Sequence, residues 1–194
     1  LPAALLDECA RVAVTAHVSG VDESGVRAAT TAELVAELAR LKAEAVFAHE
    51  DASDLALVGC DSLLDLAGAP IGKPGSPEAA ARTWRSLRGR RATLFTGHHL
   101  IVRRGDDVWR RGATAARVVG FADLDDAEIE AYVATGEPTH VAGAFTIDGY
   151  GGAYIRRLEG DPHNVVGISL PMLRDLMAEL GYAWTDLWGS PPTD

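Results

Sequence analysis

Lysine is scarce in this chain, because only Lys42 and Lys73 occur among eighteen basic residues. Basic residues as a whole are also outnumbered by acidic ones, 18 to 28, which gives a formal net charge of −10 at pH 7. Binding of a nucleic-acid polymer requires a basic face, so this balance excludes such a polymer as a partner. A single nucleotide stays possible, since a few local cations hold phosphates. Composition alone does not decide whether the two lysines are leftovers of codon bias or are retained for a function.

Long apolar runs and a signal-peptide pattern are also missing. No stretch approaches the ~20 apolar residues that span a membrane, and the N-terminus lacks a charged segment followed by an apolar one. The only cysteines, Cys9 and Cys60, are too far apart for a metal-ligand spacing and are typical of buried thiols. We therefore expect a cytoplasmic protein without a membrane partner.

What is present fits a globular α/β domain. A chain of 194 residues with 47% hydrophobic residues buries roughly 70% of its unfolded surface. Strand and helix patterns alternate, which predicts an α/β domain with a mixed sheet. We expect one domain over residues 1–194, with a core at about 12–182 and a loose tail over 184–194.

Capping residues mark the expected helix starts. Thr30 with Glu33 three residues later forms a capping box, and Ser76 precedes a proline at the first helical position. We expect helices to begin at Pro2, Thr30, Ser76, Asp123 and Ser169.

The expected strands are apolar or alternating segments between these helices. They cover residues 12–18, 55–60, 92–103, 108–121 and 153–158. The third and fourth are joined through Gly105-Asp106-Asp107, which predicts a hairpin. Residues 63–68 are expected to turn back after the second strand.

Asp61 is the first candidate for chemistry, because it follows the apolar run at 55–60. Open α/β sheets bind ligands at the carboxyl ends of their strands, where a carboxylate holds a metal or deprotonates a water. The alternative is an ordinary turn or N-cap aspartate. Glu23, Lys42, Lys73 and Asp148 add the carboxylates and cations that suit a divalent metal and a polyphosphate. Composition does not show that these residues meet in space.

Two adjacent histidines, His98 and His99, lie in the third predicted strand. Successive side chains of a strand point to opposite faces, so the pair does not ligate one metal. Core or surface packing is the favoured interpretation.

Several spaced motifs occur in a recognisable order. They are Gly59-Cys60-Asp61-Ser62, Gly72-Lys73-Pro74, Thr96-Gly97, Gly136-Glu137-Pro138, Ala142-Gly143-Ala144-Phe145, Ile147-Asp148-Gly149 and Asn164-Val165-Val166-Gly167. In this order they resemble the Maf family of nucleoside triphosphate pyrophosphatases, and the resemblance covers about residues 18–180.

The resemblance implies a fold and a reaction. The fold is a curved mixed sheet flanked by helices with a deep cleft, similar to inosine triphosphate pyrophosphatases. The reaction converts a nucleoside triphosphate and water to the monophosphate and pyrophosphate, with a divalent cation such as Mg²⁺ or Mn²⁺, and removes non-standard or excess nucleotides. A homodimer is also implied.

The resemblance further implies roles for individual residues. Asp61 matches the general base and a metal ligand, and Glu23 matches the family's acidic partner for metal or water. Lys42 and Lys73 match phosphate-binding lysines. Ser62 falls where the family usually has a threonine, near the pocket that selects the substrate.

Two departures from the family pattern bear on these roles. The family's N-terminal strand and Ser-Pro-Arg-Arg loop have no match here. We expect them to lie upstream of Leu1 in the native chain, because loss of a core strand would expose a sheet edge; the alternative is a protein whose grip on the phosphates is reduced. Asp148 stands where pyrimidine-selective members carry glutamine. An ionised aspartate only accepts hydrogen bonds, so we expect Asp148 to disfavour uracil and thymine and to favour guanine.

A different class of function stays open. The family is named for an effect on septum formation, so the chain is alternatively a nucleotide-binding regulatory protein of cell division with little turnover. A phosphatase that releases single phosphates is a third possibility. The reaction products distinguish the three.

Overall fold

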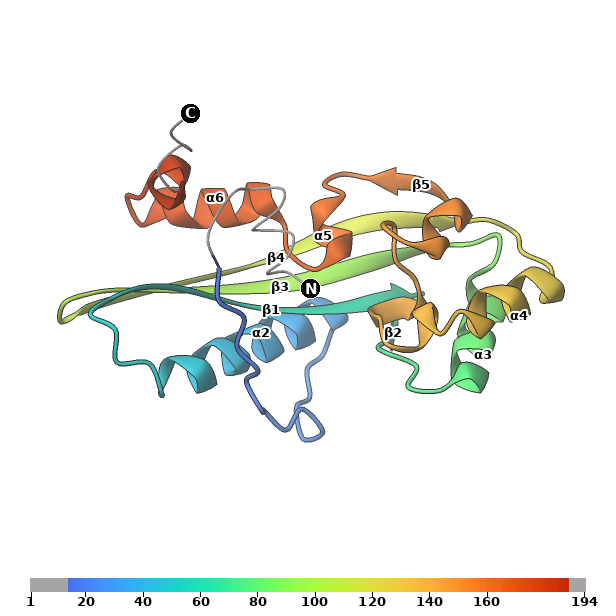
Figure 1. Ribbon diagram of the computed structural model, residues 1–194, viewed down its shortest axis with the longest axis horizontal. Helices are drawn as coiled ribbons and strands as arrows, with labels where there is room; N and C mark the ends of the chain where they lie inside the picture. The colour runs from blue at the N-terminus through green and yellow to red at the C-terminus, as the bar shows by residue number, and fades with distance from the viewer. Residues whose placement is uncertain (1–13, 189–194) are drawn as a thin grey trace, which may run out of the picture.

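A single antiparallel sheet forms the frame of the computed structural model, which describes residues 14–188. The strands lie in the order β2-β1-β3-β4-β5, and the long strands β1, β3 and β4 run side by side across the molecule (Figure 1). The bounds are β1 (Asp54–Leu66), β2 (Ala69–Ile71), β3 (Arg91–Arg104), β4 (Asp107–Phe121) and β5 (Ile155–Glu159). Where the sequence predicted a mixed sheet, the pairings between these strands are antiparallel.

Helices flank this sheet on both faces. Figure 1 shows α2 below the sheet, α5 and α6 above it, and α3 and α4 together at one end. The helices are α2 (Thr31–Phe47), α3 (Pro77–Leu87), α4 (Asp126–Ala134), α5 (His163–Val166) and α6 (Leu170–Glu179). Short 3₁₀ turns are η1 (Glu137–Thr139), η2 (Ala142–Ala144), η3 (Tyr150–Tyr154) and η4 (Trp184–Leu187). The predicted α/β class is confirmed.

Most helices begin at the capping residues that the sequence predicted. The side chains of Thr30, Ser76 and Ser169 each accept a backbone N–H at the start of a helix, as predicted. The start at Asp123 was wrong. Asp125 caps α4 instead, because its carboxylate accepts the N–H of Glu128 at 2.8 Å while Glu128 bonds back to the Asp125 N–H. That reciprocal box satisfies two otherwise unpaired donors.

β1 is longer than predicted, and this moves Asp61. The turn expected at 63–68 begins only at Ala67 and Gly68, both at positive φ. Pairing with β3 continues to Asp65 opposite Thr93, because Leu64 is fully buried in the core. Asp61 therefore lies inside the strand, opposite Gly97, and its predicted place at the carboxyl end of a strand was wrong.

The predicted hairpin between β3 and β4 is confirmed, with Arg104 opposite Asp107. The strand predicted at 12–18 is not formed at the described positions 14–18. Val18 is 98% exposed there. A strand-like residue pattern was therefore not sufficient to form a strand in the absence of a neighbouring strand to pair with. The helix predicted from Pro2 lies outside the described residues. In the predicted loose tail, residues 184–187 form the 3₁₀ turn η4, and residues 189–194 lie outside the described part.

The core at the α3–α4 end is organised around Trp84, which is fully buried. Its ring meets Phe121, Tyr132 and Tyr154 edge to face, with centroids 5.4–5.8 Å apart. The indole N–H donates to the Ala144 carbonyl at 2.7 Å, which ties η2 to α3. Such aromatic contacts add about 0.5–1.5 kcal/mol each beyond area burial.

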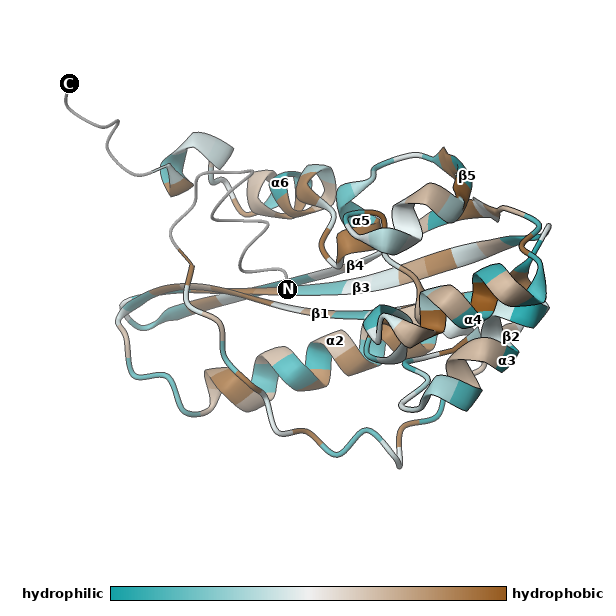
Figure 2. Cartoon of the chain, turned by 45° about the vertical axis from the view of Figure 1, so that its right-hand side comes forward, coloured by the Kyte–Doolittle hydropathy of each residue, from teal (hydrophilic) through white to brown (hydrophobic). Residues whose placement is uncertain are grey.

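Figure 2 shows apolar and polar residues interspersed along α2. The buried residues of this helix are mostly apolar and include Val35, Leu38, Ala39 and Ala43. Within residues 14–188, no helix combines the length and apolar character needed to cross a bilayer.

Candidate active site

Three of the predicted site residues meet in an ion-pair cluster. The Lys42 ammonium contacts the Asp61 carboxylate, and it lies 2.8 Å from Oε1 of Glu23. Lys42 comes from α2, Asp61 from β1, and Glu23 from the segment before α2. We call this group the Glu23–Lys42–Asp61 triad. A single cation held between two carboxylates leaves the triad with a net negative charge.

Two glycines allow this meeting. Asp61 shares its face of β1 with Gly59, and it stands opposite Gly97 of β3. A Cβ at Gly59 would overlap the Ala39 carbonyl oxygen, and one at Gly97 would overlap that of Val35. The α2 backbone therefore rests directly on the strands, which brings Lys42 within reach of Asp61. Both glycines belong to the family motifs in the sequence, but their role in helix packing was not predicted. The signal for it is a glycine inside an otherwise apolar strand.

A hydrogen bond between side chains also fixes the start of α2 against β1. The Thr31 hydroxyl donates to Asp65 Oδ2 at 2.5 Å. Asp65 lies four residues beyond Asp61 in β1, so the bond ties the start of α2 to the strand that carries Asp61. This contact orients the helix that carries Lys42.

Burial shapes the protonation of the triad. Side-chain exposure is 12% for Asp61, 24% for Lys42 and 46% for Glu23. Burial raises the pKa of Asp61, and the nearby Glu23 charge adds to this, although Lys42 and Lys73 oppose it. Burial by itself lowers the pKa of Lys42, but its two carboxylate partners outweigh that and raise it. Lys42 is therefore a permanent cation beside a carboxylate of increased basicity.

Lys73 is exposed in the segment that follows β2. Its charge acts on Asp61 through space, in the direction that favours the ionised carboxylate. Backbone hydrogen bonds hold this segment on both sides of the lysine. The N–H of Gly75 donates to the Thr139 carbonyl at 3.0 Å, and the N–H of Gly143 donates to the Gly72 carbonyl at 3.1 Å.

Ser62 points to the other face of β1. Its hydroxyl lies 2.9 Å from that of Thr96, and Thr96 in turn donates to the Asn164 carbonyl at 3.3 Å. Neighbouring side chains in a strand alternate between faces, so Ser62 is directed away from the side where Lys42 meets Asp61. Its predicted role near a substrate pocket stays a prediction.

Asp148 lies exposed in the glycine-rich segment between η2 and η3. Its carboxylate accepts a hydrogen bond from the Thr146 hydroxyl, so its side-chain contact is local rather than with the triad. The carboxylate is open to solvent and to a ligand.

The oxygen ligands available for a metal are few. Within the described residues, no group of three or more His, Cys, Asp or Glu side chains is arranged to hold a metal ion. Glu23 and Asp61 nevertheless converge on one cation, the Lys42 ammonium. Mg²⁺ commonly takes only one or two carboxylates and completes its shell with substrate phosphates and water. The donor set therefore fits a divalent cation that arrives with a polyphosphate.

The two adjacent histidines have structural roles, as the favoured interpretation held. His98 is 1% exposed. Its Nδ1–H donates to the Thr96 carbonyl at 3.1 Å, and its Nε2 accepts the Ser169 N–H at 2.8 Å. His99 lies on the opposite face, 3.7 Å from Glu44.

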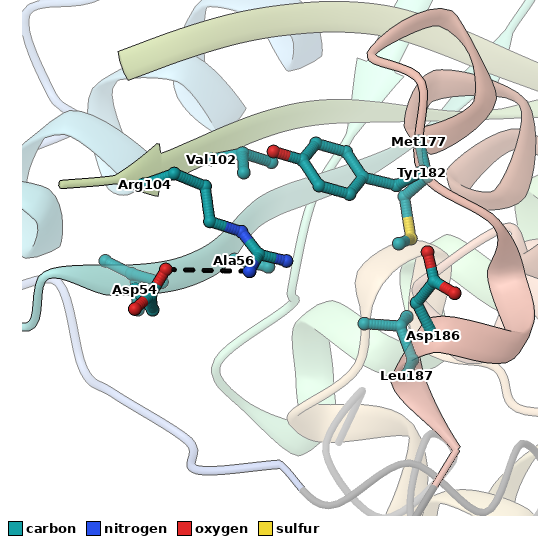
Figure 3. Close-up of a pocket in the computed structure, with 9 residues that line it drawn as sticks. Asp54, Ala56, Val102, Arg104, Met177, Tyr182, Asp186 and Leu187 are labelled. Carbon is teal, nitrogen blue, oxygen red and sulfur yellow. Dashed lines mark ion pairs between the residues drawn. The ribbon is translucent and has the colours of Figure 1, made fainter. Parts of the chain in front are cut away.

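A cavity of about 220 Å³ lies away from the triad, where β1 starts and β3 ends. Figure 3 shows Arg104 beside Asp54 and Tyr182 in this cavity; the Arg104–Asp54 ion pair measures 3.6 Å, and the guanidinium lies 5.2 Å from the ring centre. The residues that line this cavity include none of the predicted site residues.

Comparisons with known proteins agree with the motif order. Residues 3–180 match the family model described as Maf-like protein. A protein of Cutibacterium acnes is 48% identical over 178 residues, which cover 89% of this chain and 84% of that protein. One from Saccharopolyspora erythraea is 49% identical, over 90% of this chain and 87% of its own. One from Leifsonia xyli is 51% identical, over 88% and 84%. All three are named nucleoside triphosphate pyrophosphatase.

Proposed function

The chain belongs to the family of Maf-like proteins, and we propose that it hydrolyses nucleoside triphosphates to monophosphates and pyrophosphate. The shared name of its relatives supports this reaction. The observation that carries the proposal is the Glu23–Lys42–Asp61 triad, in which a half-buried cation lies against a carboxylate of raised pKa.

In the proposed reaction, Asp61 accepts a proton from water as the water oxygen attacks the α-phosphorus. The bond from this phosphorus to the bridging oxygen breaks, and pyrophosphate leaves with the bonding electrons. Lys42 and Lys73 offset the charge on the phosphates, because phosphoryl chemistry depends mainly on positioning and charge neutralisation. A divalent metal held by Asp61 and Glu23 would supply further charge neutralisation.

Substitution of Asp61 tests the proposed base. Asp61→Asn keeps the size of the side chain and its contact with Lys42 but removes the proton acceptor. We expect turnover to fall by roughly 10²–10⁴, with the melting temperature little changed. Monophosphate and pyrophosphate are quantified by chromatography after incubation with ATP, GTP, CTP and UTP plus Mg²⁺ or Mn²⁺. Full activity in Asp61→Asn would remove Asp61 from this role.

The same panel separates the competing functions. Release of single phosphate would replace the proposal by a phosphatase. Nucleotide binding by calorimetry with no product would favour the regulatory binding protein. Equal rates with and without a chelator would contradict the proposed metal dependence.

Asp148 supports a proposed preference among nucleobases. Its exposed carboxylate accepts hydrogen bonds and donates none when ionised. Guanine offers adjacent donors, whereas uracil and thymine place one N–H between two carbonyls. We expect GTP to be hydrolysed faster than UTP or dTTP, and a best rate with either pyrimidine would contradict this role.

The cellular role follows as part of the proposal. An enzyme of this kind in the cytoplasm would remove non-standard or excess nucleotides, and it would act as a homodimer. Light scattering at micromolar concentration measures the oligomeric state directly.

A further inference from the structure

The carboxylate of Glu137, from η1, is hydrogen-bonded to the glycine-rich segment 146–152, here called the Asp148 loop. Oε1 accepts the Tyr132 hydroxyl at 2.7 Å and the Gly151 N–H at 2.8 Å. Oε2 accepts the Tyr150 N–H at 2.8 Å. Two consecutive backbone donors of the loop therefore bind one side chain of η1. Hydrogen bonds to an ionised acceptor are the stronger kind.

Glycines let the loop close around this group. A Cβ at Gly149 would overlap Oε2 of Glu137, and one at Gly151 would overlap the Tyr132 hydroxyl. Gly149 has φ −132°, which any residue adopts, so the requirement there is for space and not for an unusual backbone angle. The loop is thus shaped to bring its backbone against Glu137.

Glu137 is itself anchored to the core. Tyr132 is 2% exposed and packs edge to face on Trp84 and Tyr154, with centroids 5.4 Å away in both cases. Burial alone would raise the pKa of Glu137, but the donors of Gly151, Tyr132 and Tyr150 outweigh it and lower that pKa. The carboxylate therefore stays charged at neutral pH and keeps all three hydrogen bonds.

The segment that begins with Glu137 also holds the loop of Lys73. Thr139 of η1 accepts the Gly75 N–H at 3.0 Å, and Gly143 of η2 donates to the Gly72 carbonyl at 3.1 Å. Residues 137–143 therefore connect the loop of a predicted phosphate-binding lysine to the loop of the predicted base-reading aspartate. A fixed distance between the two loops is what selection among nucleobases requires, because the phosphates and the base belong to one ligand.

We propose that Glu137 is a positioning residue for substrate selection, which holds the Asp148 loop in place relative to Lys73. This inference rests on the proposed function. Glu137 acts through the backbone of the loop and contacts neither the phosphates nor the reacting water.

Glu137→Gln is the direct test, since it keeps the shape of the side chain but turns one of its oxygens into a donor. One backbone N–H of the loop then faces another N–H. The ratio of kcat/KM for the best over the worst of the four triphosphates should fall by about tenfold, while kcat for the best stays within about threefold. A merely structural defect would instead lower kcat/KM for all four triphosphates by the same factor. Amide exchange at Tyr150 and Gly151 should become at least tenfold faster.

Matched variants complete the experiment. Glu130→Gln removes a carboxylate from the exposed side of α4, 3.9 Å from Arg85, and should change neither the ratio nor the exchange. Gly149→Ala pushes the loop off Glu137 from the other side and should reproduce the loss of selectivity, even where Glu137→Gln folds poorly.

The outcomes separate the two proposals. If the wild-type protein releases pyrophosphate from none of the triphosphates, both the proposed function and the proposed role of Glu137 in substrate selection are overturned. An active wild-type enzyme whose ratio is unchanged in Glu137→Gln and Gly149→Ala overturns only the inference about Glu137. A wild-type enzyme without preference among the four also overturns that inference, because there is then no selection to maintain.

Discussion

Among individual residues, the two lysines differ in their surroundings, although the sequence predicted the same phosphate-binding role for both. Lys42 is 24% exposed and pairs with two carboxylates, whereas Lys73 is exposed in a loop. Removal of one partner from a buried ion pair leaves an uncompensated charge. Removal of an exposed lysine leaves stability nearly unchanged. The two positions are therefore natural controls for each other.

Lys73→Ala should raise the KM for triphosphates by about tenfold, with unfolding free energy within about 0.5 kcal/mol of wild type. Lys42→Ala should abolish most activity and also lower stability by about 1–3 kcal/mol, because Asp61 and Glu23 then repel each other. Urea titration and steady-state kinetics on both variants measure these effects. Equal stability losses in the two would contradict the difference in their surroundings.

His98 predicts an acid-sensitive fold. Burial lowers its pKa from 6.5 to about 4, so the unfolded chain binds a proton more readily than the folded one. Stability is then complete above about pH 6.5 and declines as pH falls towards 4, by on the order of 3 kcal/mol. Urea midpoints between pH 7 and pH 4 follow this decline. His98→Gln should flatten that part of the profile, and an equally steep profile would exclude His98 as its source.

Among the elements, the contact between α2 and the sheet decides the geometry of the triad. The helix backbone rests on Gly59 and Gly97, where a side chain would meet a helix carbonyl. Packed interiors absorb added atoms only through backbone shifts. Lys42 and Asp61 are nineteen residues apart in sequence, so their contact depends on this one packing distance.

Gly97→Ala should therefore move α2 away from the sheet. We expect a loss of about 1–3 kcal/mol in stability, together with a fall in turnover as Lys42 separates from Asp61. Gly25→Ala, at a position with open space around the added Cβ, serves as the stability control. Wild-type stability in Gly97→Ala would show that the helix tolerates the extra methyl group.

On the scale of the whole molecule, charge limits the choice of ligands. The net charge of −10 repels an extended polyanion, whose binding requires many phosphate contacts. A single polyphosphate needs only the few cations near Asp61. The acidic molecule and an anionic substrate are thus compatible at one site.

Competition experiments check this expectation. Duplex DNA in micromolar excess should leave triphosphate hydrolysis unchanged at about 0.15 M salt, where surface charges are screened beyond about 8 Å. Inorganic pyrophosphate, the proposed product, should compete with the substrate. Inhibition by DNA at low micromolar concentration would reveal a basic surface that the charge balance does not indicate.

Local features of this protein could be predicted from its amino-acid sequence alone. The caps at Thr30, Ser76 and Ser169 and the β3–β4 hairpin are confirmed, because capping and tight turns depend on residues a few positions apart. The order of motifs was likewise sufficient to indicate the family.

The arrangement of the candidate site follows from packing between elements and could not be predicted from the sequence. This packing placed Asp61 inside β1 rather than at its end, joined it to Lys42, and turned Ser62 to the opposite face. It also set Glu137 against the Asp148 loop. Each of these outcomes depends on burial and on contacts between elements distant in the chain, and local propensity carries no information about either.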